Sequence, residues 1–299
     1  MSGRILLASL LAPALLMPIV GSAANWISTN DGFSADAEVR ESNPDQPRGS
    51  STELASRQRN DYLTGDANAG IDRNSAIYTR IDFPAAVVPP NFTTAFRMTY
   101  RNSNLTGDRI QDTVTPNPAY RTGLAIYGLT DWVAAASWNE ATITYNTAPG
   151  LTPDGDIGTK DFNSDLRFLG TVLFPEIGTQ NHLPVGYQLR FCSAALDQFV
   201  QDAINAGSTS VTLVSTVIHS GEAPIPNWIS FSYLFNSSEK TTLNTDNYDP
   251  GNGMGNIGNL TSTDNSTGDF SPALGFADKT TLGLQNICDS YPPPPPPGC

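Results

Sequence analysis

Apolar and polar residues alternate along many short segments of the chain, and this pattern constrains the fold more than any other feature. Side chains of a β-strand point alternately to its two faces, so a strand with one buried face has this period of two. The alternation predicts strands at residues 35–40, 77–83, 96–101, 187–191 and 229–235, with more apolar, central strands at 124–129 and 211–218. Clusters of Gly, Asn, Asp and Pro separate these segments and favour turns. The sequence shows no β–α–β alternation, so we expect an all-β fold: a two-sheet antiparallel β-sandwich, jelly-roll-like.

One segment has helical spacing instead. Its apolar residues recur three and four positions apart and would form one face of a helix: Leu196, Phe199, Val200, Ala203 and Ile204. Ser193 suits the N-cap and Gly207 the left-handed residue after the last turn. We therefore expect one short helix, lying across one end of the sheets.

Length and composition indicate a single domain with a loop insertion. The chain has 299 residues, of which 39% are hydrophobic and 15% charged, with a formal charge of −13. An acidic chain with scattered basic residues is unsuited to nucleic acid, and no 20-residue apolar span follows the N-terminal segment, so we expect no membrane span. The domain is predicted at residues 25–287, its insertion at 240–271, and a proline-rich tail at 288–299.

The first 24 residues are typical of a secretory signal peptide. Arg4 provides the positive charge, an apolar stretch follows, and the small residues at 21–24 suit cleavage. Pro13 and Pro18 interrupt the apolar stretch, which argues against a membrane anchor. We expect a secreted protein, extracellular or on the cell surface.

Three cysteines, Cys192, Cys288 and Cys299, leave the disulfide pairing open. Cys192 with Cys288 would tie the end of the domain to its core, whereas Cys288 with Cys299 would close a short loop. Six prolines at residues 292–297 predict a stiff spacer of roughly 19 Å. Either Cys299 beyond it is an attachment point or the sequence is a fragment.

Several strands, taken in order, resemble one known family. The segments are ADAEVR at 35–40, YTRIDF at 78–83, AFRMTY at 95–100 and, most specific, WNEATITYNTAP at 138–149. Over residues 33–276 the chain resembles the DNRLRE-type secreted β-sandwich domains, which are disaggregatase-related and similar to carbohydrate-binding modules. This resemblance implies a non-catalytic extracellular module that in some members binds polysaccharide such as alginate. A neutral glycan suits the acidic composition better.

Aromatic residues in polar loops are the candidates for sugar binding, because apolar ring faces bind sugar rings. They are Trp132, Tyr62, Tyr120 and Tyr248. Trp138 and Glu140 are expected to be structural: the ring caps the core and the carboxylate accepts backbone N–H bonds in a turn. A ring folded onto its own loop is the alternative for each loop aromatic.

We expect no cofactor, but oxygen-bearing side chains at alternating positions around a glycine form a candidate site for a structural Ca²⁺. They are Asp66, Asn68 and Asp72. Asp154, Asp156 and Asp161 form a second acidic loop that is no more specific, and for both loops solvated turn residues are the default interpretation.

The sequence contains no motif of a known catalytic centre, and His182 and His219 have no recognisable partners. We therefore expect a non-catalytic module that binds extracellular polysaccharide. The alternative is a self-associating structural subunit of a cell surface, matrix or filament, which the proline segment and terminal cysteine favour. A polysaccharide-active enzyme is the third hypothesis, because 29 acidic residues allow a carboxylate pair to form by folding.

Overall fold

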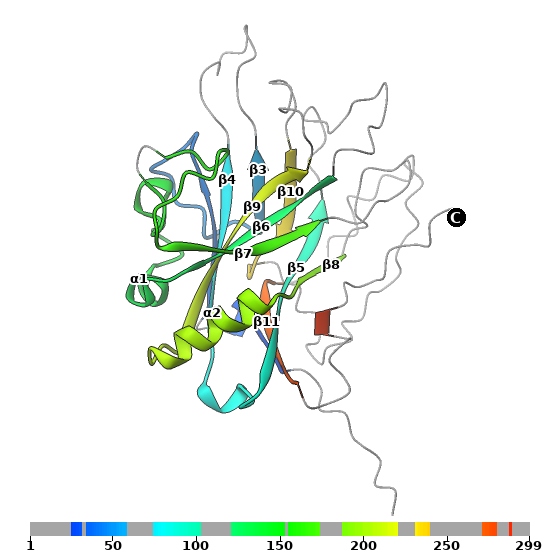
Figure 1. Cartoon of the computed structure of the whole chain (residues 1–299). Helices are drawn as coiled ribbons and strands as arrows, with labels where there is room; N and C mark the ends of the chain where they lie inside the picture. Colours follow the sequence, from blue (N-terminus) through cyan, green and yellow to red (C-terminus); the bar gives the residue numbers. More distant parts are fainter. Residues whose placement is uncertain are drawn as a thin grey trace, which may run out of the picture.

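The computed structural model describes residues 25–31, 34–58, 74–102, 121–152, 155–173, 187–220, 231–239, 271–279 and 287–288. In these ranges, eleven antiparallel strands form a curled, sandwich-like sheet (Figure 1). The predicted all-β fold is confirmed. The strand order is β1-β11-β5-β10-β3-β4-β9-β6-β7, with β2 paired to β4 and β8 paired to β5.

The strands lie in two layers that share β5. One layer contains β1 (Asn25–Ser28), β11 (Ala273–Asp278), β5 (Phe92–Asn102) and β8 (Gln188–Phe191). The other contains β2 (Ala35–Arg40), β3 (Glu53–Gln58), β4 (Ser75–Asp82), β6 (Arg121–Leu129), β7 (Leu166–Leu173), β9 (Ser210–Ser220) and β10 (Phe231–Asn236). The first part of β5 pairs with β11 and β8, and its end pairs with β10.

The main core lies between these layers and is closed by a helix. It contains Ile77 and Ile81 of β4, Phe96 of β5 and Leu213 of β9, all buried. The helix α2 (Ala194–Asn205) buries the apolar face that its spacing predicts, and the Ser193 hydroxyl accepts the N–H of Leu196 at 2.9 Å. Gly207 has a positive φ of 78° just past the helix end.

A second apolar cluster covers the opposite face of β2, β4 and β9. It contains Ala37 and Tyr78 from the strands, and Trp138 and Tyr145 from the segment that follows β6. This segment begins with a short helix, α1 (Trp132–Ser137), capped by the Asp131 carboxylate, and includes the 3₁₀ turn η3 (Tyr145–Thr147). A six-residue helix is too short to show helical periodicity, and the sequence pattern did not predict it.

The strand β2 is buried on both faces: its apolar residues Ala35, Ala37 and Val39 belong to this second cluster, and its polar residues are buried as well. Its bounds match the predicted residues 35–40, but the inference that only one face is buried is wrong here. Asp36 and Glu38, the polar half of the alternation, are fully buried. Two carboxylates are therefore held inside the protein.

A disulfide joins Cys192 to Cys288, with 5.7 Å between their Cα atoms, which is the first of the two pairings considered above. It links the segment after β8 to the short described stretch at 287–288, beside Ile287 and Trp26. Within the described ranges, no helix is both long and apolar enough to cross a bilayer. The predicted signal peptide at 1–24, residues 240–270 of the insertion, and residues 289–299 of the tail lie outside the described residues.

Candidate functional site

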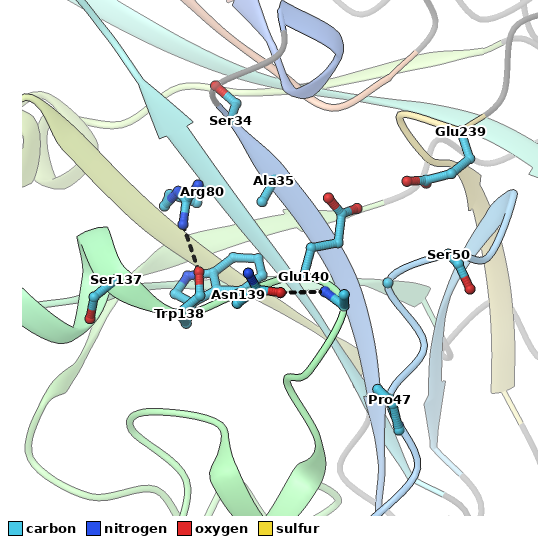
Figure 2. Close-up of a pocket in the computed structure, with 12 residues that line it drawn as sticks. Ser34, Ala35, Pro47, Ser50, Arg80, Ser137, Trp138, Asn139, Glu140 and Glu239 are labelled. Carbon is cyan, nitrogen blue, oxygen red and sulfur yellow. Dashed lines mark hydrogen bonds between the residues drawn. The ribbon is translucent and has the colours of Figure 1, made fainter.

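A cleft of about 500 Å³ opens beside β2, at the edge of the second apolar cluster (Figure 2). Its lining is rich in polar side chains from segments that are far apart in the sequence. These are the hydroxyls of Ser34, Ser50 and Ser137, the amide of Asn139, and the carboxyl groups of Glu140 and Glu239. The cleft therefore presents both hydrogen-bond donors and acceptors to a ligand.

Trp138 forms a fixed wall of the cleft. The residue is only 7% exposed, its indole N–H donates to the Thr212 hydroxyl at 2.9 Å, and its ring makes an edge-to-face contact with that of Tyr78. The Arg80 guanidinium lies 5.5 Å from the ring centroid and donates to the Trp138 carbonyl oxygen at 2.6 Å. With these contacts the ring positions the segment that follows it and has little free surface for a sugar.

The main chain after Trp138 is held in a tight turn that carries Glu140. The Asn139 side-chain oxygen accepts the N–H of Ala141 at 2.9 Å, and the Asn139 carbonyl accepts the N–H of Ile143 at 2.8 Å. On the other side Gly49 packs so closely that an added Cβ would lie 2.1 Å from the Glu140 carbonyl oxygen. The position of Glu140 thus depends on a glycine at residue 49.

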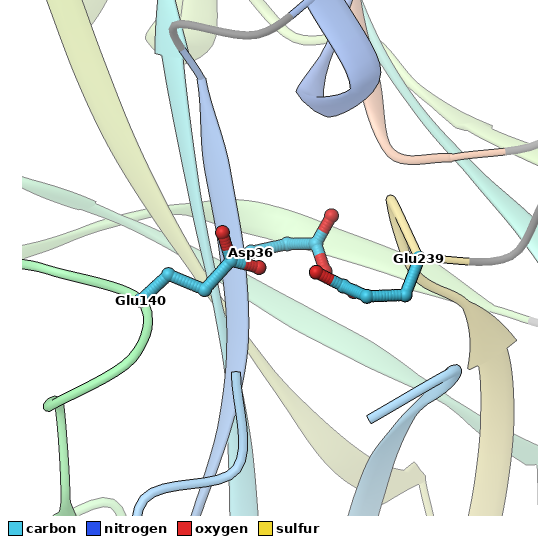
Figure 3. A group of neighbouring side chains, drawn as sticks. All are labelled: Asp36, Glu140 and Glu239. Carbon is cyan, nitrogen blue, oxygen red and sulfur yellow. The ribbon is translucent and has the colours of Figure 1, made fainter. Parts of the chain in front are cut away.

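Three carboxyl groups converge at one side of the cleft (Figure 3). Oxygen atoms of Asp36, Glu140 and Glu239 all lie within 4.8 Å of one another. Asp36 is fully buried; its Oδ2 accepts the N–H of Ser238 at 3.0 Å, while its Oδ1 has no hydrogen-bond partner among the described residues. We call these three residues the acidic triad.

Burial and mutual repulsion raise the pKa of two triad members. Burial is the main cause that raises the pKa of Asp36 to about 7, and the charge of Glu239 adds to it, while contacts with Thr29 and Ser238 act in the opposite direction. The pKa of Glu140 rises to about 8, through burial first and then the charges of Asp36 and Glu239. At neutral pH the triad therefore favours states in which a proton or a cation reduces its negative charge.

The structure places few of the sequence-predicted site residues at this cleft. Trp132 is the first residue of α1 and is partly buried, with its ring centroid 5.3 Å from that of Phe199, so part of its ring is covered by α2. The other candidates for sugar or Ca²⁺ binding lie outside the described residues: Tyr62, Tyr120, Tyr248, Asp66, Asn68 and Asp72. Among the residues singled out from sequence, Trp138 and Glu140 reach the cleft.

The sequence patterns did not predict two groups of residues at the cleft or on the surface. Asp36 and Glu239 complete the triad, but nothing in their local sequence distinguishes them from other acidic turn or strand residues. Phe168 on β7 is 53% exposed and packs against Tyr127, which also contacts Phe162, so aromatic side chains meet at this edge of the sheet. The alternation of Leu166 and Phe168 was the available signal for β7.

No protein-family model matches the chain, and no curated protein matches it. The resemblance to the DNRLRE-type domains therefore stays an expectation from the sequence.

Proposed function

We propose that this chain is a secreted, non-catalytic module that binds extracellular polysaccharide in the cleft beside β2. The observation that carries the proposal is the lining of that cleft by hydroxyl, amide and carboxyl groups. Sugar hydroxyls both donate and accept hydrogen bonds, so they match such a lining. The buried Trp138 and the turn behind it hold these groups on a packed β scaffold, which lowers the entropy lost on binding.

The charge of the cleft favours a neutral glycan over a uronate polymer. Glu140 and Glu239 line it, and the chain carries 29 acidic against 16 basic residues. Arg80 also lines the cleft, but it contacts Asp82 at 3.3 Å and the Trp138 carbonyl. A polyanion would meet repulsion at this surface.

Filling the cleft tests the proposal. Ser50 is exposed in the lining, so S50W should block the cleft without disturbing the core. We expect S50W to weaken binding to neutral polysaccharides at least tenfold in affinity electrophoresis. The matched control is A195W, at an exposed position of α2 that contributes nothing to the cleft, and it should bind like the parent protein.

Three further outcomes separate the other hypotheses. If F168A rather than S50W loses binding, sugar recognition belongs to the aromatic edge of β7 and the cleft assignment is wrong. Polymerisation without binding to any polysaccharide would favour the structural-subunit alternative. Release of reducing ends by the purified protein, abolished by E140Q, would make the chain a polysaccharide-active enzyme.

A further inference from the structure

We infer that Asp36, Glu140 and Glu239 form a site for a divalent cation, and that the ion it takes is Ca²⁺. The three side chains come from β2, from the turn after α1 and from the segment after β10. An ion bound there would join these three parts of the chain at one side of the cleft. The inference does not depend on glycan recognition, because it concerns the ion alone.

The charge of the triad favours a cation. When ionised, three carboxylates whose oxygens lie within 4.8 Å of one another repel each other unless a proton or a cation reduces their charge. The guanidinium that lines the same cleft, that of Arg80, is engaged with Asp82 and with the Trp138 carbonyl. No ion pair between described residues joins a basic side chain to the triad, whereas a divalent ion would supply the missing positive charge.

One buried oxygen atom of Asp36 independently favours a bound ion. The Asp36 side chain is fully buried; the Thr29 hydroxyl lies near its carboxyl group, yet Oδ1 accepts no hydrogen bond of standard geometry in the described part of the chain. A buried acceptor without a partner is unfavourable, and such groups in native proteins are usually satisfied by water or an ion. This atom belongs to a carboxylate that faces two others, so a cation is the ligand that suits it best.

The ligand set selects the type of ion. All three groups offer oxygen, with no cysteine or histidine among them, which is the preference of hard cations such as Ca²⁺ and Mg²⁺. Ca²⁺ binds oxygen at about 2.3–2.6 Å in a flexible geometry, so three oxygens that lie within 4.8 Å of one another can contact the same ion. Mg²⁺ needs about 2.0–2.1 Å and strict octahedral geometry, which makes it the weaker fit.

Calorimetric titration of the chelator-treated full chain with CaCl₂ at pH 7.5 tests the site. We expect saturable binding, a higher Tm with Ca²⁺ and a smaller increase with Mg²⁺. E140Q and E239Q should each weaken Ca²⁺ binding at least tenfold. Both change residues that line the cleft, so they avoid the folding defect that a substitution at buried Asp36 could cause.

Two controls make the result decisive. D202N alters a partly exposed carboxylate on α2, remote in sequence from the triad, and should bind Ca²⁺ like the parent protein. The double variant D66N/D72N alters the acidic segment singled out from sequence and should also bind normally. The inference is overturned if the parent protein shows no Ca²⁺ binding, or if binding survives E140Q and E239Q.

Discussion

Two carboxylates on the same strand, Glu38 and Asp36, are stabilised in different ways. Both are fully buried and both belong to β2, two residues apart. The Glu38 carboxylate accepts hydrogen bonds from Nε and Nη2 of Arg40, the latter at 2.9 Å. Asp36 instead accepts one backbone N–H and faces Glu140 and Glu239. The chain therefore provides a basic side chain that neutralises Glu38, whereas the charge of Asp36 must be neutralised by a proton or an ion.

Removing the countercharge of Glu38 should have the largest effect. R40M keeps much of the apolar stem of Arg40 but leaves a fully buried carboxylate without its ion-pair partner. Breaking a buried pair in this way costs about 3–5 kcal/mol. Urea unfolding followed by circular dichroism should therefore show a large drop in the free energy of unfolding. A loss below about 1 kcal/mol would mean that Arg48, the other basic residue near Glu38, already compensates it.

The acidic triad should make the calcium-free protein less stable as pH rises. The pKa of Asp36 is raised from 3.8 to about 7 and that of Glu140 from 4.5 to about 8, so between about pH 4 and 8 the native state binds more protons than the unfolded state. The free energy of unfolding then decreases by about a few kcal/mol as pH rises through this window, mostly through buried Asp36 because Glu140 is partly screened by solvent. Urea unfolding at pH 5, 6.5 and 8 with a chelator measures it.

The charged groups around Asp36 on the neighbouring elements are Glu140, Glu239 and, across the cleft, Arg80. D36N removes one of the two shifted groups, so its pH profile should be flatter than that of the parent protein. Equal slopes for the two proteins would contradict the assignment of this pH dependence to the triad.

An exposed ion pair should give the smallest effect and sets the scale for the other two. Arg167 donates to Asp202 at 2.6 Å, but the two side chains are 41% and 31% exposed. Solvent and salt screen such a pair, so R167A should change the free energy of unfolding by less than about 1 kcal/mol. If R167A costs as much as R40M in the same urea experiment, burial does not explain the difference between these ion pairs.

The elements that the sequence predicts correctly are those with a pattern confined to neighbouring residues. The alternation at residues 35–40 matches β2, and the apolar spacing with Ser193 and Gly207 at its ends matches α2. Both signals depend on neighbours within a few residues. The cover over β2 could not be read in this way, since it comes from the segment after β6, which reaches β2 only in the folded chain.

The acidic triad shows the same limit more strongly. Glu140 drew attention because it follows Trp138, but its partners lie about a hundred residues away in each direction. Their meeting depends on the register of β2 with β4, in which Asp36 lies opposite Thr79, and on the path of the chain after β10. No periodicity in the sequence encodes those long-range positions.

The shared strand β5 couples the unfolding of the two layers. Its first residues pair with β11 and β8, while Tyr100 and Asn102 near its end pair with β10 in the other layer. Because β5 belongs to both layers, the layers can separate only if the hydrogen bonds between β5 and its neighbours in one of them break. The two layers are thus mechanically coupled, and we expect local unfolding at either end of β5 to destabilise the strands that shape the cleft.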